Sequence, residues 1–148
     1  MGAVEGRRGR LIVYLGSAPG VGKTYAALGE AHRRLARGTD VVVGFVETHD
    51  RAQTAAQVDG LEVVPRRTLS YRGSAFTEMD VDAVLARHPT VVLVDELAHT
   101  NVPGSRHEKR ARDVEELLAA GIDVITTLNM VLSLPRAAVG SGARAEAS

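Results

Sequence analysis

A short glycine-rich segment, GSAPGVGKT at residues 16–24, carries the residue types and the spacing that bind phosphate. Its pattern is that of the phosphate-binding loop G-x-x-x-x-G-K-[ST], a Walker A motif, although Ser17 stands where the first glycine is expected. Glycines let a backbone fold closely around phosphate oxygens, and amides at the start of a helix point towards an anion. We therefore predict a nucleotide-phosphate site, in which the neighbouring Gly16 supplies the flexibility that Ser17 lacks. The alternative is an ordinary glycine turn.

Within this segment each residue has an expected role. Lys23 should reach the β- and γ-phosphates, and the Thr24 hydroxyl should be a ligand of Mg²⁺. A dinucleotide-binding loop is less favoured, because GVGKTY lacks the third glycine of that fingerprint. The predicted nucleotide-binding residues are Ser17, Ala18, Pro19, Gly20, Val21, Gly22, Lys23, Thr24 and Tyr25.

Two neighbouring acids form a second pattern. The apolar run VVLVDE ends in Asp95 and Glu96, as in a Walker B element, where an acid at the carboxyl end of a parallel strand holds Mg²⁺. We predict that Asp95 binds the metal, directly or through water. Glu96 is then placed to orient a water molecule or to accept a proton, so it is the predicted catalytic residue. The alternative is a pair of solvated acids at a strand end.

Apolar runs that alternate with helical patterns must position these residues. This alternation predicts an α/β fold of the P-loop NTPase type, a mostly parallel sheet with helices on both faces in three α/β/α layers. Residues 71–80 are expected to form a turn or a small hairpin. Predicted strands are 10–15, 40–46, 89–96 and 123–128, with a weaker one at 61–65, and predicted helices are 23–37, 81–87 and 108–120.

The domain limits follow from composition along the chain. We expect a flexible N-terminus at residues 1–9 and a nucleotide-binding domain at 10–134. Residues 135–148 are rich in Ala, Gly and Ser, so we expect a disordered tail there.

Overall composition narrows the class of protein. The chain has 148 residues, 45% of them hydrophobic, which suits one globular domain. Lys plus Arg and Asp plus Glu both number 18, so no net charge favours binding to nucleic acid or to an anionic membrane. The chain has no cysteine, and the apolar run LIVYL is too short to be a signal peptide or a membrane span. We expect a cytoplasmic location, without direct membrane insertion.

Other polar residues receive simpler interpretations. The sequence DELAH lacks the first histidine of H-E-x-x-H, so a metal site at His99 is not favoured. Thr127 is expected to be a packing or strand-end residue, whereas Asn129, at the end of the last strand, could sense the nucleotide. Either a solvated helix start or a lid that reaches the γ-phosphate could explain a basic run formed by Arg106, Lys109 and Arg110.

Longer segments resemble a known family. GSAPGVGKTYA, VVVGFVETHDR, VVLVDELAHTNVPGSRHEKR and DVEELLAAGIDVITTLN are similar to the N-terminal cytoplasmic P-loop domain of the potassium-sensing Kdp sensor histidine kinases, the KdpD family. The similarity covers about residues 9–129. It implies ATP and Mg²⁺ as cofactors, and ATP binding that adjusts the balance of kinase and phosphatase activity in the control of potassium and turgor. It also implies, as partners, the remaining domains of a membrane sensor kinase or its response regulator.

The chain departs from this family at two places. After TTLN it continues with MVLSLPRAAVGSG, and Asp50 stands where the family usually has glycine.

Three classes of function stay open. The first is a regulatory ATP-binding module with at most slow hydrolysis, and the second is a phosphotransferase that moves the γ-phosphate to a hydroxyl of a protein or small molecule, with Glu96 or His99 as base. The third is an interaction domain without nucleotide.

Overall fold

The computed structural model describes residues 7–16, 21–129 and 143–147. The helices are α1 (Val21–Ala36), α2 (Ala52–Val58), α3 (Val81–Arg87) and α4 (Arg110–Ala119). The strands are β1 (Leu11–Gly16), β2 (Val41–Phe45), β3 (Glu62–Val63), β4 (Arg67–Tyr71), β5 (Ser74–Glu78), β6 (Val91–Val94), β7 (Asp123–Asn129) and β8 (Ala143–Ala147).

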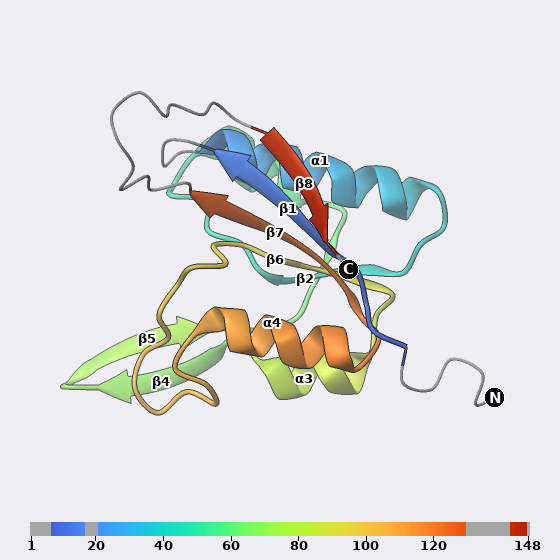
Figure 1. Ribbon diagram of the computed structural model, residues 1–148. Coiled ribbons are helices and arrows are strands. Elements are labelled where there is room, and N and C mark those ends of the chain that lie inside the picture. The colour runs from blue at the N-terminus through green and yellow to red at the C-terminus, as the bar shows by residue number, and fades with distance from the viewer. Residues whose placement is uncertain (1–6, 17–20, 130–142, 148) are drawn as a thin grey trace, which may run out of the picture.

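The main sheet has the strand order β3-β2-β6-β7-β1-β8. All its pairings are parallel except that of β8, which runs antiparallel to β1. Helix α1 covers one face of the sheet, and α3 and α4 cover the other (Figure 1). The predicted three-layer α/β fold is therefore confirmed.

Each face of the sheet has its own apolar core. On the α1 side, Leu28 and Ala31 of the helix pack on Ile12, Val43 and Leu93 of the strands. The opposite core joins α3 and α4 to the sheet and includes Val84, Leu117 and Val92. Strands that are covered on both faces read as continuous apolar runs, which is why VVVGF and VVLV lack alternation.

Helix α2 and the small hairpin differ from the prediction. Helix α2 was not expected at all, because AQTAAQV has no apolar stripe, and Thr54 is its buried residue. The small hairpin begins earlier than residue 71, since β4 starts at Arg67. Its loop is Arg72 and Gly73, with φ values of 51° and 79°, as the tight turns between antiparallel strands require.

The chain ends also differ from expectation where they are described. Residues 143–147 were expected to be disordered, but they form β8 beside β1. Backbone pairing along a sheet edge needs no large apolar side chain, so the composition ARAEA does not prevent it. Near the other end, expected to be flexible, Gly9 is buried and donates its amide to the carbonyl of Leu118 at 2.8 Å. Residues 1–6, 130–142 and 148 lie outside the described residues.

Parallel pairing places the carboxyl ends of five strands at one edge of the sheet. Gly16 pairs with Asn129 at the ends of β1 and β7, and Val94 pairs with Thr126 between β6 and β7. Open α/β sheets bind their ligands at this edge. The predicted site residues that follow these strands therefore converge.

Candidate functional site

A polar pocket of about 300 Å³ lies at the carboxyl edge of the sheet. It is bounded by the first turn of α1, the loop after β2, the loop after β6 and the end of β7. Its lining residues are Lys23, Thr24, His49, Asp95, Glu96, Ala98, His99, Thr127, Leu128 and Asn129. The structure thus brings together five predicted site residues, namely Lys23, Thr24, Asp95, Glu96 and Asn129.

Asp95 is the buried centre of this pocket, with 1% of its surface exposed. The Thr24 hydroxyl donates to its carboxylate, at 3.2 Å from Oδ1 and 3.1 Å from Oδ2. The Thr127 hydroxyl donates to Oδ1 at 2.5 Å, and the Glu47 amide donates to Oδ2 at 3.1 Å. These donors from three other segments hold the carboxylate in one orientation against the first turn of α1.

Thr127 is a site residue that sequence reasoning missed. It was expected only to pack or to end a strand, yet it orients Asp95 and also accepts a hydrogen bond from the Glu96 amide at 3.0 Å. The register of the two strands explains its position, because the pairing of Val94 with Thr126 leaves Asp95 beside Thr127. A parallel alignment of the two predicted strands would have been needed to find it.

The arrangement of Thr24 and Asp95 fits a magnesium ion bound to phosphate. Because the Thr24 hydroxyl donates its hydrogen bond to Asp95, the lone pairs of its oxygen are available to a cation. Among the described residues no group of three or more His, Cys, Asp or Glu side chains could hold a metal alone. A metal here would therefore need oxygens from phosphate and water, which is how Mg²⁺ usually binds.

Lys23 lies over Gly16. A Cβ atom added to Gly16 would come within 2.6 Å of the Lys23 Cδ atom and 2.8 Å of its Cγ atom. The absence of a side chain at Gly16 thus leaves room for the lysine stem, and the predicted flexibility of Gly16 stays a prediction. Residues 17–20, which hold the predictions for Ser17, Ala18, Pro19 and Gly20, lie outside the described residues, as does the side chain of Val21.

Glu96 occupies an unusual backbone conformation at the rim of the pocket. Its φ is 59°, a left-handed value that is uncommon for a residue with a long side chain. Its side chain is 40% exposed, and one carboxylate oxygen lies 3.6 Å from His49 Nε2. The sharp turn points the chain away from the strand directly after Asp95, so both neighbouring acids line one pocket.

Two predicted nucleotide-binding residues do not line this pocket. Gly22 and Tyr25 instead line a neighbouring cavity, together with Ala26 and residues 51–54. Tyr25 is 46% exposed there. The predicted set is therefore divided between two adjoining hollows around the start of α1.

A buried ionic network supports the floor of the pocket. Arg110 is fully enclosed; its Nη1 donates to the Asp95 carbonyl at 2.8 Å and its Nη2 lies 3.0 Å from Glu78 Oε1. Burial lowers the pKa of the Arg110 guanidinium, and Glu78 opposes this shift. Glu78 also contacts His99 Nε2 at 3.0 Å. His99 thus pairs with Glu78 and joins the pocket to the end of β5.

The basic run at the start of α4 does not form a lid over the pocket. Besides the buried Arg110, Arg106 pairs with Asp82 at 2.6 Å and with Glu116 at 2.5 Å. Lys109 donates to the Thr100 hydroxyl at 2.8 Å. These cations stabilise the loop that follows β6, and the structure does not support the lid hypothesis.

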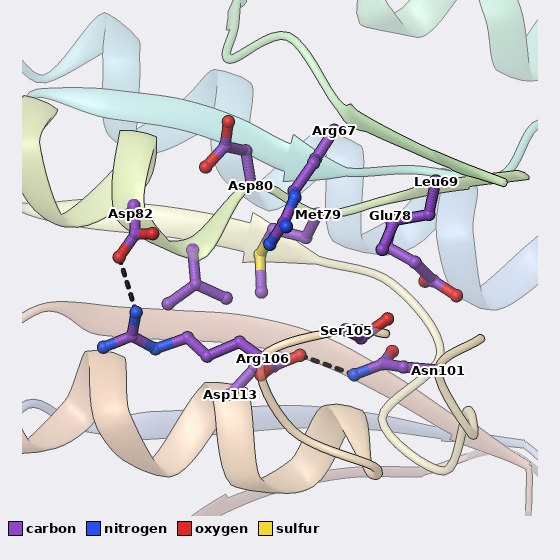
Figure 2. Close-up of a pocket in the computed structure, with 11 residues that line it drawn as sticks. Arg67, Leu69, Glu78, Met79, Asp80, Asp82, Asn101, Ser105, Arg106 and Asp113 are labelled. Atoms are coloured by element: carbon purple, nitrogen blue, oxygen red, sulfur yellow. Dashed lines mark hydrogen bonds and ion pairs between the residues drawn. The ribbon is translucent and has the colours of Figure 1, made fainter. Parts of the chain in front are cut away.

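A third, much smaller cavity lies between the β4–β5 hairpin, the start of α3 and α4, and Figure 2 shows the side chains around it. Its volume of about 20 Å³ is room for about one water molecule. Asn101 donates to Asp113 Oδ2 at 2.9 Å and to the His107 carbonyl at 2.9 Å. Burial raises the pKa of Asp113. This cluster fixes the loop 101–107 on α4.

Arg106 should give the protein a pH-dependent contribution to stability. Its hydrogen bonds to Glu116, with a smaller contribution from His107, lower the pKa of Glu116 to about 2. A lowered carboxylate pKa stabilises the fold above the usual value of 4.5, and this contribution is lost as the pH falls from 4.5 towards 2. Because the pair is exposed, Arg106→Gln should lower the melting temperature by only about 1–4 °C at pH 7.

The measurement is thermal unfolding of both proteins between pH 7 and pH 3, where the difference in melting temperature should shrink. Arg112→Gln is the matched control, since Arg112 makes an exposed contact of 3.4 Å with Glu115. A difference that stays constant over this pH range would contradict the assignment.

Together the fold and the pocket define a three-layer α/β protein with a buried aspartate, a lysine and two threonines at the carboxyl edge of its parallel sheet. Residues 7–134 match the family model described as the osmosensitive K⁺ channel His kinase sensor domain, KdpD. The chain belongs to this family, and the resemblance predicted from the sequence is confirmed.

Individual relatives agree. Over 127 residues the chain is 64% identical to the sensor protein KdpD of Mycobacterium tuberculosis strain H37Rv, covering 86% of this chain and 15% of that protein. Over 123 residues it is 58% identical to the sensor protein KdpD of Escherichia coli K12, a match that covers 83% of this chain and 14% of that protein. A putative sensor protein KdpD of Synechocystis is 54% identical over 124 residues, a match that covers 84% of this chain and 34% of that protein. The chain thus spans about a third or less of the length of these relatives.

In the described part of the chain, every helix is too short or too polar to span a bilayer.

Proposed function

We propose that this chain is an ATP-binding regulatory domain of a Kdp-type potassium and turgor sensor kinase. The observation that carries the proposal is the contact of Thr24 with the buried Asp95, in the pocket that Lys23 also lines. A lysine, a hydroxyl and an acid at the start of a helix and the end of a strand are the groups that hold a nucleoside triphosphate with its metal. Family membership supports ATP as that nucleotide.

Each residue has a chemical duty in this proposal. Lys23 balances the charge of the β- and γ-phosphates, and the amides at the start of α1 donate to phosphate oxygens. Thr24 and Asp95 hold Mg²⁺, which when bound offsets phosphate charge and polarises the phosphoryl group. Glu96 orients a water molecule for slow hydrolysis, and Asn129 at the rim responds to the bound nucleotide.

Occupancy of the pocket is the regulatory signal. His99 lines the pocket and contacts Glu78, which pairs with Arg110. A ligand that moves His99 therefore acts on the end of β5, whose hairpin with β4 projects beside α4 (Figure 1). The partners are ATP and the remaining domains of a membrane sensor kinase or its response regulator. We place the domain in the cytoplasm. It is not expected to bind nucleic acid or to insert directly into a membrane.

Calorimetric titration with ATP, ADP and GTP, with and without Mg²⁺, tests nucleotide binding directly. Lys23→Ala should weaken ATP binding about 10- to 100-fold, because charge-assisted hydrogen bonds to phosphate are lost. Without nucleotide, the variant should remain folded. Lys109→Ala, which removes an exposed lysine outside the pocket, is the matched control.

Equal ATP affinity in Lys23→Ala and wild type would contradict the phosphate site. Label transfer from ATP to a partner protein would instead favour the phosphotransferase. A wild-type protein whose melting temperature does not respond to ATP would favour an interaction domain without nucleotide.

A further inference from the structure

We propose that the cavity beside the phosphate pocket binds the adenine ring of the nucleotide, with Tyr25 as its stacking surface. This inference rests on the proposed function, since it assigns a second part of the same ligand. The cavity has a volume of about 420 Å³ and is lined by Gly22, Tyr25 and Ala26 of α1 and by residues 51–54. Much of this lining is apolar, as an aromatic ring requires.

The first turn of α1 borders both the phosphate pocket and the neighbouring cavity. Lys23 and Thr24 line the phosphate pocket, whereas Gly22 and Tyr25, directly before and after them in the chain, line the cavity. At 3.6 residues per turn these pairs lie on opposite sides of the first turn of α1. Phosphates bound at the start of this helix would therefore lie between the two hollows, so a nucleotide can reach both.

The loop after β2 also borders both hollows. His49 lines the phosphate pocket and Arg51 lines the cavity. The Arg51 amide donates to the Thr48 carbonyl at 3.0 Å, which closes this loop into a compact turn. The cavity and the proposed phosphate site are thus bordered by the same two segments of the chain, the start of α1 and the loop after β2.

Tyr25 has the exposure that a stacking residue needs. It is 46% exposed, and it follows immediately after the residues proposed to hold phosphate and metal. Base–aromatic stacking accepts any flat ring, and a guanidinium plane such as that of Arg51 serves in the same way. An exposed tyrosine beside an arginine at an apolar cavity is therefore a suitable surface for a nucleobase.

Thr54 provides an independent observation. Only 1% of its surface is exposed, and its hydroxyl has no hydrogen-bond partner among the described residues. A helical threonine usually bonds a carbonyl three or four residues earlier, and it has two available χ1 rotamers. The hydroxyl oxygen is itself buried, so a ligand could pair with it only after the side chain turns to its other χ1 rotamer. Because a buried unpaired hydroxyl is unfavourable, such pairing would add affinity.

The polar groups of the cavity suit the edge of adenine. The Thr54 hydroxyl and the Gln53 side-chain amide can each donate and accept hydrogen bonds. Adenine presents an amino donor beside a ring-nitrogen acceptor, and glutamine pairs with both groups at once. These residues favour a base with both kinds of group on one edge.

The experiment compares ATP with inorganic tripolyphosphate, which has the phosphates but no base. In Tyr25→Ala, calorimetric affinity for ATP should fall about 5- to 100-fold, the range expected for one stacked base, while affinity for tripolyphosphate stays the same. Tyr25→Phe should bind ATP like the wild type. Lys23→Ala should weaken both ligands.

Thr54→Val tests the polar edge, because valine has the shape of threonine without the hydroxyl. It should lower ATP affinity about 2- to 10-fold, the value of one hydrogen bond, without affecting tripolyphosphate. Its melting temperature without ligand should equal or exceed that of the wild type, because an unpaired hydroxyl has been removed.

The outcomes separate this inference from the proposed function. A wild-type protein that binds neither ligand overturns both. If it binds tripolyphosphate as tightly as ATP, or if Tyr25→Ala leaves ATP affinity unchanged, the phosphate site stands and the base site is overturned. An equal loss for both ligands in Tyr25→Ala also overturns it, since Tyr25 would then act on the phosphates.

Discussion

Arg110→Met should lower the free energy of unfolding by about 3–5 kcal/mol, the loss expected when one partner of a buried ion pair is removed. Arg110 has no exposed surface, and Glu78, its partner at 3.0 Å, is also buried. The substitution leaves the Glu78 carboxylate with His99 and the Val102 amide, but without its arginine. It also leaves the Asp95 carbonyl without the guanidinium donor. The guanidinium further stacks on the Phe45 ring at 3.9 Å.

Urea denaturation at pH 7 measures this loss. Arg112→Met is the matched control, because Arg112 lies two positions away on the same helix with an exposed side chain, and it should change stability by no more than about 0.5 kcal/mol. The double variant Arg110→Met with Glu78→Gln should recover part of the stability, since the uncompensated buried charge is then gone. A loss below about 1 kcal/mol in the single variant would show that the pair does not stabilise the fold.

Glu96→Gln should reduce any ATP hydrolysis by about 10²- to 10⁴-fold, the range expected for loss of a general base, while ATP binding stays nearly intact. The reason is position: Glu96 lies at the rim of the pocket, whereas the neighbouring Asp95 is buried against Thr24. Asp95→Asn should therefore have the opposite profile, with weaker ATP binding mainly when Mg²⁺ is present. Single-turnover hydrolysis and calorimetry on the same preparations separate the two effects.

Glu47→Gln is the informative comparison. Glu47 follows β2, and its backbone amide donates to the Asp95 carboxylate, so it is a further acid next to the site. If Glu47→Gln stops turnover and Glu96→Gln does not, Glu47 is the base. If Glu96→Gln abolishes binding and leaves turnover per bound nucleotide unchanged, the roles of the neighbouring acids are wrong.

The fold and the centre of the site were predictable because they depend on local patterns. Apolar runs located β1, β2, β6 and β7, and the parallel arrangement then required Thr24 and Asp95 to lie near one edge of the sheet. Helix α2 was not predicted because its sequence shows no apolar periodicity. Its tertiary contacts with α1 stabilise it, and these cannot be seen in the local sequence. The strand at residues 143–147 depends on backbone pairing with β1, which composition does not reveal.

The supporting residues of the site were harder to predict. Arginine is rarely fully buried, so the basic run gave no reason to place Arg110 beneath the pocket. Its burial depends on Glu78, which is 32 residues away in the chain. Thr127 contributes through strand register, and register is decided by how whole strands align rather than by any single residue.

If the pocket binds a nucleotide as proposed, the turn after β2 should affect the kinetics of that binding. His49 and Asp50 have φ values of 52° and 58°, a left-handed pair that most side chains disfavour but that aspartate tolerates. The Arg51 amide donates to the Thr48 carbonyl at 3.0 Å, so a backbone hydrogen bond closes this corner without a ligand. The corner is therefore preorganised before any ligand arrives. A nucleotide that contacts both of its sides has little chain to order on binding, and the gain in affinity should be seen as a longer residence time.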